Sequence, residues 1–484
     1  MQLYFIRHGG EVTSLELEKT YGAQKVRLSL PELETELLLF LLQQANKLAN
    51  CAIYALRQSV IWFGRSRFHL EVVKNELQTE LKENVHYTVL HSQAGQSVLH
   101  KIAENFNAYQ EGVSAFFRGE NSIKPKLPHY RKKGGLHEIT YPEQALKKKY
   151  DEHGYPMLGF PLGWDIKKLY GDDMHSIDYI WMPYPTNIKP SNIVEVTISP
   201  QNGDLYAVFI YKASTEIKPS LNYELALGID HGVNNWLTCV PNTGKQGFIV
   251  DGKQLKAFNQ LYHKEVSNGK TGKPEGFWNN HLNRLTGKRN RQMHDATNKA
   301  AKFIVDYCLT EKIGNIVFGW NKGQSQRMEM GRKNNQNFAT IPTGKLKERL
   351  RQLCSSHGIH FHETEESYTS KSSFFDHDAL HVFGERPESW KASGKRTKRG
   401  LYITGRGFHI SSDANGACNI LRKVADKIGI SLSKISVNCC QILDRVYLWK
   451  RSRITEAQRK STAACCQGNS SRLNRLVKIE SPSS

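Results

Sequence analysis

The sequence predicts an α/β protein with more than one domain, and three observations support this. The chain has 484 residues, more than a single hydrophobic core usually holds. Hydrophobic residues make up 39% of it and aromatic residues 10%, which is enough for packed cores. Helical periodicity dominates residues 31–118, whereas buried-type strands alternate with helices after about residue 223. We therefore expect an α/β multidomain fold.

The first half of the chain is predicted to be a β-rich domain interrupted by helices. Residues 1–30 alternate apolar and polar side chains in places, as short strands do. A helical pattern begins at about Pro31. A proline is tolerated in the first turn of a helix, so it is compatible with a helix that begins there. The pattern persists to about Arg118 with an interruption near Asn84. Residues 137–220 are then predicted to form short strands joined by turns.

The second half is predicted to follow the element order of an RNase H-like fold. Leu225–Asp230 is a buried-type strand, and two short strands follow it as antiparallel neighbours. Further buried-type strands at Ile316–Phe318 and Ile359–Phe361 alternate with helices. Three hairpin strands followed by alternating helix and strand is the RNase H-like order.

The charge balance indicates a polyanionic partner. The chain carries 67 Lys and Arg against 46 Asp and Glu, a formal net charge of +21, so nucleic acid is the first candidate and an acidic membrane surface the second. The longest apolar run, Leu37–Leu42, is too short to span a bilayer, and the first residues lack a secretory pattern. The nine cysteines show no paired framework, which favours a reducing cytoplasm. We expect a cytoplasmic protein without a membrane partner.

A basic loop after the helices is predicted to contact nucleic acid. Between Ile123 and Gly135, cations are interleaved with prolines and rings. Prolines restrict the backbone and rings offer stacking, so phosphate or base contacts are favoured over a solvated basic face. The candidates in this loop are Lys124, Lys126, His129, Tyr130, Arg131, Lys132 and Lys133. Those elsewhere are Arg284, Lys288, Arg289, Arg291, Lys322, Arg396, Lys398 and Arg399.

Two acidic residues stand where metal ions could be held. Asp230 ends an apolar strand, and a carboxylate fixed rigidly there suits Mg²⁺, which prefers hard oxygen ligands. A turn-initiating Asp is the simpler alternative. Asp413 precedes a predicted helix, where Asp also caps well. The small residues Ala414, Gly416 and Ala417 would let that helix pack close to a sheet. Its first turn would then lie near the carboxylate on the central strand.

Three ordered motifs resemble the RuvC-like nuclease of the TnpB family. They are Leu-Gly-Ile-Asp230-His-Gly, Glu-Ser-Tyr368-Thr-Ser-Lys371 and Asp413-Ala-Asn-Gly-Ala. This family comprises transposon-encoded RNA-guided DNA nucleases related to type V CRISPR effectors. The resemblance is best over 223–427 and weaker over 88–140. It implies a guide RNA, a double-stranded DNA target with a short flanking motif, and two Mg²⁺ ions. One protein monomer per guide RNA is expected.

The resemblance also implies a domain plan. Residues 1–30 and 119–222 would form a β-barrel-like wedge domain that holds RNA, and 31–118 a helical recognition lobe. Residues 223–427 would form the nuclease domain, with an insertion at 370–400. Residues 428–484 would form a basic C-terminal tail that is partly disordered.

The chain departs from the family at the second acid. In most members this acid follows the strand that matches Asn315–Phe318, where this chain has Gly319. Glu365 and Glu366 lie near the end of the next strand, which should neighbour the first. In an extended segment Glu366 shares a face with Tyr368, so Glu366 is predicted as the relocated acid and Glu365 is the alternative. The predicted catalytic and metal-binding residues are Asp230, Glu366 and Asp413.

A second departure concerns zinc. The family usually carries two Cys-x-x-Cys pairs before the last acid, but residues 372–410 contain no cysteine. We therefore expect no zinc, and a metal-free loop or hairpin packed through Phe374, Phe375 and Trp390. For Asp376–Asp378, a solvated turn is favoured over a metal site.

Two alternative functions stay open at this stage. Gly319 favours a nuclease-inactive, RNA-guided DNA-binding protein of the repressor type. The other alternative is an RNase H-like transposase or resolvase that uses no guide. A defined RNA that co-purifies with the protein would separate the guided from the unguided class.

Overall fold

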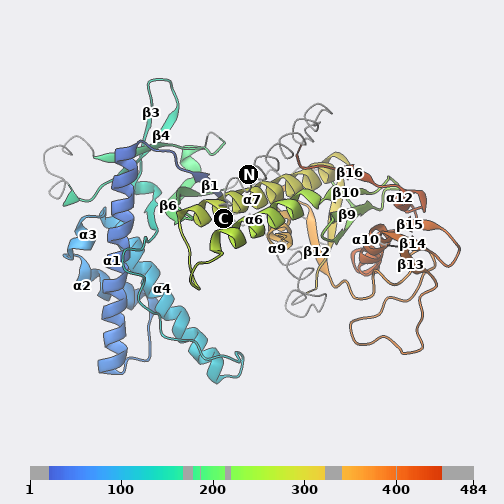
Figure 1. The fold of residues 1–484 in the computed structure, drawn as a ribbon, viewed down its shortest axis with the longest axis horizontal. Coiled ribbons are helices and arrows are strands. Elements are labelled where there is room, and N and C mark those ends of the chain that lie inside the picture. The colour runs from blue at the N-terminus through green and yellow to red at the C-terminus, as the bar shows by residue number, and fades with distance from the viewer. Residues whose placement is uncertain are drawn as a thin grey trace, which may run out of the picture. The chain divides into compact units, whose positions relative to one another are not determined.

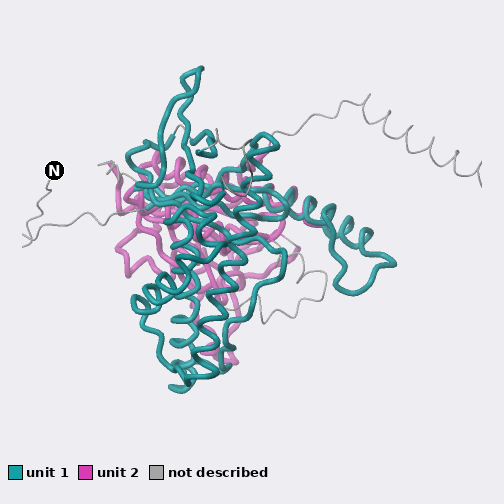
Figure 2. The backbone as a smooth tube through the Cα atoms, turned by 90° about the vertical axis from the view of Figure 1, so that its left-hand side faces the viewer, with its two compact units in different colours: residues 1–217, 262–291 teal, residues 218–261, 292–484 magenta. Residues whose placement is uncertain are grey.

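The computed structural model describes residues 21–166, 178–185, 187–212, 220–321, 341–398 and 400–449. The chain divides into two compact units, which Figure 2 shows in different colours. The first unit comprises Met1–Ile217 with Tyr262–Arg291, and the second comprises Lys218–Leu261 with Gln292–Ser484. Within the described ranges, every helix is too short or too polar to cross a membrane.

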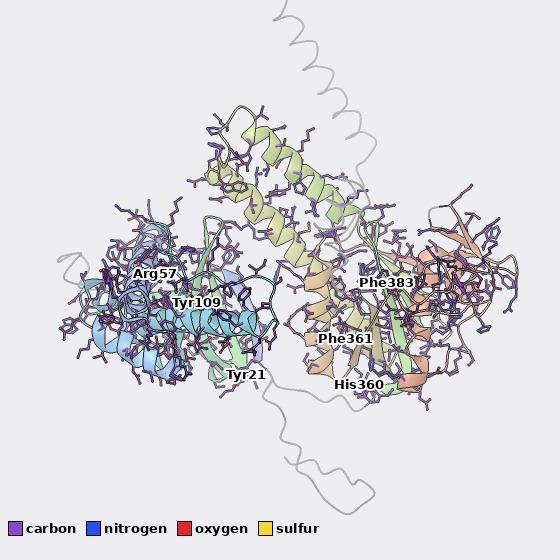
Figure 3. The ribbon with its side chains drawn as sticks, turned by 90° about the horizontal axis from the view of Figure 1, so that it is seen from below. Tyr21, Arg57, Tyr109, His360, Phe361 and Phe383 are labelled. Carbon is purple, nitrogen blue, oxygen red and sulfur yellow. The ribbon has the colours of Figure 1, made fainter. Side chains whose placement is uncertain are left out.

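The helices of the first unit begin at the predicted proline. They are α1 (Glu32–Phe63), α2 (Leu70–Leu81), α3 (Val85–Thr88) and α4 (Ser92–Phe117). Pro31 is the N-cap of α1, and Gly64 ends the helix with a φ of 60°, a left-handed conformation that glycine adopts without steric cost. Figure 1 shows the long helices α1 and α4, and Figure 3 labels Arg57 and Tyr109 on them.

Two antiparallel sheets complete the first unit. One has the order β1 (Tyr21–Arg27), β7 (Asp204–Lys212), β6 (Ile193–Gln201) and β2 (Ile139–Pro142). The other consists of β3 (Lys147–Tyr150), β4 (Pro156–Pro161) and β5 (Tyr179–Pro183), and the 3-10 turns are η1 (Glu143–Ala145) and η3 (Pro190–Asn192). Phe106 of α4 and Val196 of β6 belong to one hydrophobic cluster, so the helices and the first sheet share a core.

A six-stranded sheet forms the centre of the second unit. Its order is β12 (His360–Thr364), β11 (Ile313–Gly319), β8 (Asn222–His231), β9 (Asn235–Pro241), β10 (Phe248–Asp251) and β16 (Asp444–Val446). β8, β9 and β10 are antiparallel neighbours, whereas β11 runs parallel to β8 and β12 parallel to β11. Three hairpin strands followed by two parallel strands on the other side of β8 is the order expected from the sequence.

Helices cover both faces of this sheet. They are α6 (Lys253–Lys270), α7 (Asn280–Thr310), α9 (Thr343–His357), α10 (Ser412–Arg422), α11 (Ala425–Ile428) and α12 (Asn438–Gln441). Part of α6 and part of α7 are counted with the first unit. A small sheet of β13 (Lys395–Lys398), β14 (Leu401–Ile403) and β15 (His409–Ser411) precedes α10.

The alternation of side chains along β8 determines the face of the six-stranded sheet on which Asp230 lies. Leu227 and Ile229 share a core with residues of α7 and α9, whereas Ala226 shares the opposite core with Ala417 of α10. Because successive side chains of a strand point to opposite faces, Asp230 lies on the face that α10 covers.

Two glycines allow α10 to approach β8 closely. A Cβ on Gly228 would lie 2.6 Å from the carbonyl oxygen of Ala417 and 2.6 Å from Cγ of Leu421. A Cβ on Gly416 would lie 2.9 Å from Oδ2 of Asp230. Backbone atoms cannot move aside cheaply, so these glycines set the distance between helix and strand.

The segment after α11, which we predicted as the start of a basic tail, packs onto the second unit. β16 pairs with β10 in parallel. The indole Nε1–H of Trp449 donates to Oδ2 of Asp295 over 3.1 Å, and its ring contacts Phe258 with centroids 5.4 Å apart. The predicted tail beyond residue 449 lies outside the described residues.

Gly228→Ala is expected to lower the free energy of unfolding by about 1–3 kcal/mol, the usual cost of overpacking a core. Denaturant unfolding measures it. Gly344→Ala is the matched control, because a Cβ there meets only Trp320 at ordinary contact distance, 3.6 Å. Equal stability of Gly228→Ala and wild type would contradict the packing argument.

Candidate active site

Asp230 and Asp413 line one cleft in the second unit, as the sequence predicted. Asp230 lies near the end of β8, and Asp413 lies in the first turn of α10, whose N-cap is Ser411. The cleft has a volume of about 500 Å³. Its other polar lining residues include Asn235, Lys253, Arg396 and Arg445.

Asp230 is buried among other carboxylates. Its pKa is raised well above the usual value, first by burial and then by the negative charges of Glu366 and Asp413. Charges influence one another this strongly only at short range in a poorly solvated environment. The structure therefore brings the three predicted acids into one electrostatic group.

Glu366 fills the space beside Asp230 that Gly319 leaves empty. Phe318 pairs with Ile229 across β11 and β8, so the next residue on each strand, Gly319 and Asp230, lie side by side. A Cβ on Gly319 would lie 2.7 Å from Oε1 and 2.8 Å from Cγ of Glu366. The carboxylate of Glu366 thus lies where a side chain from position 319 would project.

Hydrogen bonds hold the C-terminal end of β12 so that the side chain of Glu366 reaches the space beside Asp230. The backbone N–H of Trp320 donates to the carbonyl of Thr364 over 2.8 Å, and the N–H of Glu366 donates to Oδ1 of Asn321 over 2.8 Å. A turn follows, in which Tyr368 has a φ of 62°. The extended geometry that we assumed from Glu366 to Tyr368 is therefore wrong, because the turn ends the two-residue alternation.

The neighbouring glutamates are neutralised by ion pairs. Nζ of Lys347 lies 3.0 Å from Oε2 of Glu363, and Nζ of Lys423 lies 2.6 Å from Oε1 of Glu365. Oε1 of Glu366 has no hydrogen-bond partner among the described residues. This difference favours Glu366 over Glu365 as the acid of the site.

His231 gives the site a neutral wall. Burial lowers its pKa to about 4, so the imidazole is uncharged at neutral pH. Its ring packs near Phe318 and Trp320, with centroids 6.0 Å and 5.5 Å away. Its Nε2 lies 3.4 Å from Oε1 of Glu366. A neutral ring here leaves the carboxylates without a resident cation on that side.

The carboxylates of the site are oxygen donors of the kind that Mg²⁺ prefers. Within the described ranges, no group of three or more His, Cys, Asp or Glu side chains is arranged so that it could hold a metal ion. A two-ion arrangement divides its carboxylates between the ions, and Mg²⁺ takes much of its coordination from water and phosphate oxygens. Asp230, Glu366 and Asp413 supply hard oxygen donors whose mutual repulsion a cation would relieve.

The predicted basic loop lies on the first unit and is anchored to α1. The N–H of Arg131 donates to Oδ1 of Asn50 over 2.8 Å, and its Nε donates to Oδ1 of Asn46 over 3.0 Å. The guanidinium of Arg57 lies 5.3 Å from the ring centre of Tyr130. Arg131 therefore helps to hold the loop. Arg131 is nevertheless exposed, as are the cationic and imidazole side chains of Lys124, Lys126, His129, Lys132 and Lys133.

The remaining basic candidates are dispersed. Arg284 and Lys288 are exposed on α7, whereas Arg291 pairs with Asp204 over 2.6 Å. Arg289 is half-buried, with its guanidinium 5.9 Å from the ring centre of Tyr262. In the second unit, Lys398 is exposed on β13, and a guanidinium nitrogen of Arg396 lies 3.7 Å from Oδ1 of Asp413 in the cleft. Lys322 and Arg399 lie outside the described residues.

The segment in place of the zinc ribbon is held by hydrogen bonds. The hydroxyl of Ser373 donates to Oδ2 of Asp376 over 2.6 Å, its N–H donates to Oδ2 of Asp378 over 2.7 Å, and the N–H of Ser393 also donates to Asp378. The expected turn is present and His377 is exposed, but the carboxylates of Asp376 and Asp378 bond to the loop instead of pointing only to solvent.

The aromatic residues of this segment pack in two places. Phe374 is buried and contacts Phe375, with ring centroids 5.1 Å apart. Trp390 instead lies near Tyr368 and His381, at 6.5 Å and 5.6 Å.

Asn235 and Arg445 were missed by the sequence analysis, although both line the cleft. Asn235 is the first residue of β9 and directly follows the turn-rich residues after Asp230, so in the sequence its amide looks like a turn residue. Arg445 stands in the segment that we predicted as a tail. Its sequence neighbourhood carries no signal of a site.

Comparison with known proteins supports the predicted resemblance. The family model OrfB_IS605, described as a probable transposase, matches residues 208–324. The predicted TnpB resemblance is confirmed. The match to this transposase family includes Asp230 and Gly319 but ends before Glu366 and Asp413. No curated protein matches the chain.

The TnpB-like chain also resembles solved structures. One is described as "Cryo-EM structure of the Cas12f1-sgRNA-target DNA complex", with a TM-score of 0.56 and 15% identity over 80% of this chain and 82% of that chain. Another is described as "Structure of the mini-RNA-guided endonuclease CRISPR-Cas_phi3", with a TM-score of 0.40 and 10% identity over 84% of this chain and 92% of that chain. The first likeness shows a shared fold.

The raised pKa values predict an unusual pH dependence of stability. Burial raises the pKa of Glu366 to about 7, compared with about 4.3 for an unfolded Glu. The folded state therefore binds more protons in this window, so metal-free protein should lose stability as pH rises from about 5 to about 8. Glu366→Gln should weaken that loss, which melting temperatures measured in a chelator would show.

Glu365→Gln is the control for this measurement, because Glu365 is already paired with Lys423. Mg²⁺ should raise the melting temperature of wild type more at pH 8 than at pH 6, since it binds the ionised carboxylates. Identical pH profiles for wild type and Glu366→Gln would contradict the assignment of a buried, proton-binding Glu366.

Proposed function

We propose that this protein is an RNA-guided DNA endonuclease that hydrolyses phosphodiesters at one RuvC-like site made by Asp230, Glu366 and Asp413. The observation that carries the proposal is the carboxylate of Glu366 in the space over Gly319, beside Asp230. Simple loss of the acid that usually follows β11 would not by itself bring the carboxylate of another residue into that space. The family match and the shared fold support the class of protein.

The two halves of the chain would divide the work. The strand order of the second unit supports an RNase H-like nuclease domain at 223–427. Residues 1–30 and 119–222 would form the wedge domain, and 31–118 the helical lobe. The net charge of +21 suits a guide RNA paired with one strand of a DNA target, with a short flanking motif read by protein. The protein would act in the prokaryotic cytoplasm, as one monomer per guide.

The chain's own residues prepare the site for hydrolysis. β8 holds Asp230 rigidly, the hydrogen bond that the N–H of Glu366 donates to Oδ1 of Asn321 fixes Glu366, and Nδ2 of Asn235 donates to Oδ2 of Asp413 over 2.8 Å. Asp230, Glu366 and Asp413 would hold the Mg²⁺ ions. When bound, such ions activate water and stabilise the leaving oxygen of a phosphodiester. Arg396, which lines the same cleft, would contact a phosphate of the DNA strand.

Cleavage of a guide-matched plasmid in Mg²⁺ tests the proposal. Asp230→Ala and Glu366→Ala should each slow cleavage by more than about a hundredfold, since losing a metal ligand costs more than losing a residue behind it. Glu365→Ala is the matched control and should cut within a few-fold of wild type. Target binding, measured separately by gel shift, should survive in all three. Wild type that binds the target and never cuts it would replace the nuclease with a binding-only protein.

A relocation experiment tests the place of the second acid. Glu366→Ala removes the Glu366 atoms that lie near Gly319. Adding Gly319→Glu returns a carboxylate there from β11, provided that the side chain of Ile420 shifts, because its Cδ1 would lie 2.5 Å from the new Cβ. The double variant should cut measurably faster than Glu366→Ala alone. Gly319→Gln in the same background is the control, because it fills the space without a charge. Equal rates for the Glu and Gln versions would contradict the idea that the carboxylate itself is required there.

The family description as a probable transposase favours one second candidate, a guide-free enzyme with the same site chemistry. Sequencing of RNA that co-purifies with the protein distinguishes the two. A defined RNA species supports guided cleavage, and nuclease activity without any bound RNA supports the guide-free enzyme.

A further inference from the structure

The C-terminal part of the described chain reaches the active-site cleft. β16 runs parallel to β10, with Arg445 opposite Ile249. Both residues line the cleft that contains Asp230 and Asp413. The site therefore includes a residue from beyond the predicted nuclease domain.

A chain of hydrogen bonds connects Arg445 to Asp413. One guanidinium nitrogen of Arg445 donates to Oδ2 of Asp251 over 2.6 Å, and the other donates to Oδ1 of Asn235 over 3.1 Å. Nδ2 of Asn235 donates in turn to Oδ2 of Asp413 over 2.8 Å. Asp251 is buried and also accepts the N–H of Lys253 over 2.9 Å. Asp251 thus fixes the guanidinium group of Arg445 that also bonds Asn235.

The chemistry of these groups fixes the orientation of Asn235. A guanidinium can only donate hydrogen bonds, so the side of Asn235 that faces Arg445 must be its carbonyl oxygen. The amide nitrogen then faces Asp413, where it donates to the carboxylate. Without Arg445, the side chain of Asn235 would lose the bond that fixes its oxygen, and only Asp413 would hold the amide. Arg445 therefore influences the position of the Asp413 carboxylate through two successive hydrogen bonds.

We propose that Arg445 is a positioning residue for Asp413, acting through Asn235, so that the C-terminal strand β16 completes the metal-binding site. This inference rests on the proposed function of Asp413. It assigns the segment after residue 427 a role inside the nuclease. A direct contact between Arg445 and a DNA phosphate is the rival role that the experiment must distinguish.

Metal binding without nucleic acid is the first readout. Calorimetric titration with Mn²⁺ alone should show affinity about tenfold to a hundredfold weaker in Arg445→Ala and in Asn235→Ala, the usual effect of removing a group that orients a metal ligand. The double variant should be no weaker than the weaker single variant, because both act along one path. Asp444→Ala, an exposed residue of the same strand, is the control and should bind like wild type.

Cleavage kinetics give the second readout. Arg445→Ala should lower kcat while the KM for target DNA stays within a few-fold, because only the carboxylate is disturbed. Arg445→Lys should not restore the rate, since one ammonium cannot bond Asp251 and Asn235 in the same fork. A raised KM with unchanged Mn²⁺ affinity would overturn the proposal in favour of a phosphate contact.

Asn235→Ala keeps the proposal testable if Arg445→Ala fails to fold. Removing Arg445 leaves Asp251 buried without its cation, which can unfold a domain, whereas Asn235→Ala keeps that ion pair. Unchanged Mn²⁺ affinity in folded Asn235→Ala would overturn the inference. If wild type never cuts DNA, the proposed function fails, but the Mn²⁺ titrations still decide whether Arg445 positions Asp413.

Discussion

The active site depends on how closely α10 packs against β8. Gly228 on the strand and Gly416 on the helix remove the two side chains that would separate these elements. The helix brings Asp413 with it, while the alternation of side chains along β8 turns Asp230 to the same face. Because interiors pack at nearly crystalline density, this spacing is set by the core rather than by the carboxylates. The core therefore keeps together like charges that would otherwise move apart.

The second acid shows how one volume can be filled from either of two strands. β11 and β12 are parallel neighbours, so the ends of both strands lie at the same edge of the sheet. Glycine at 319 and a glutamate two residues beyond β12 place a carboxylate in the same volume as an acid on β11 would. In this chain Oδ1 of Asn321 accepts a hydrogen bond from the N–H of Glu366, which holds the residues before the turn. Position in space, and not position in the motif, is what the chemistry requires.

The sequence predicts the parts of the site that are local and misses those that depend on tertiary pairing. Asp230 and Asp413 could be found because their sequence neighbours, an apolar strand and a helix with small residues, indicate where each carboxylate lies. Glu366 was chosen on an extended geometry that the turn at Tyr368 breaks, although ion pairing of Glu365 leads to the same residue. The bond between Asn235 and Arg445 could not be predicted, because it needs β16 to pair with β10 across almost two hundred residues.

The same features explain why a cation would stabilise such a site. Burial raises the pKa of both Asp230 and Glu366, so in the absence of metal the fold pays for ionising them as pH rises. Two of the cations near the site are engaged elsewhere, Lys423 with Glu365 and Arg445 with Asp251, whereas Arg396 lies 3.7 Å from Asp413. Neutral His231 offers no charge. A divalent ion that enters this cleft would therefore relieve repulsion that Arg396 offsets only in part, and this would strengthen its binding.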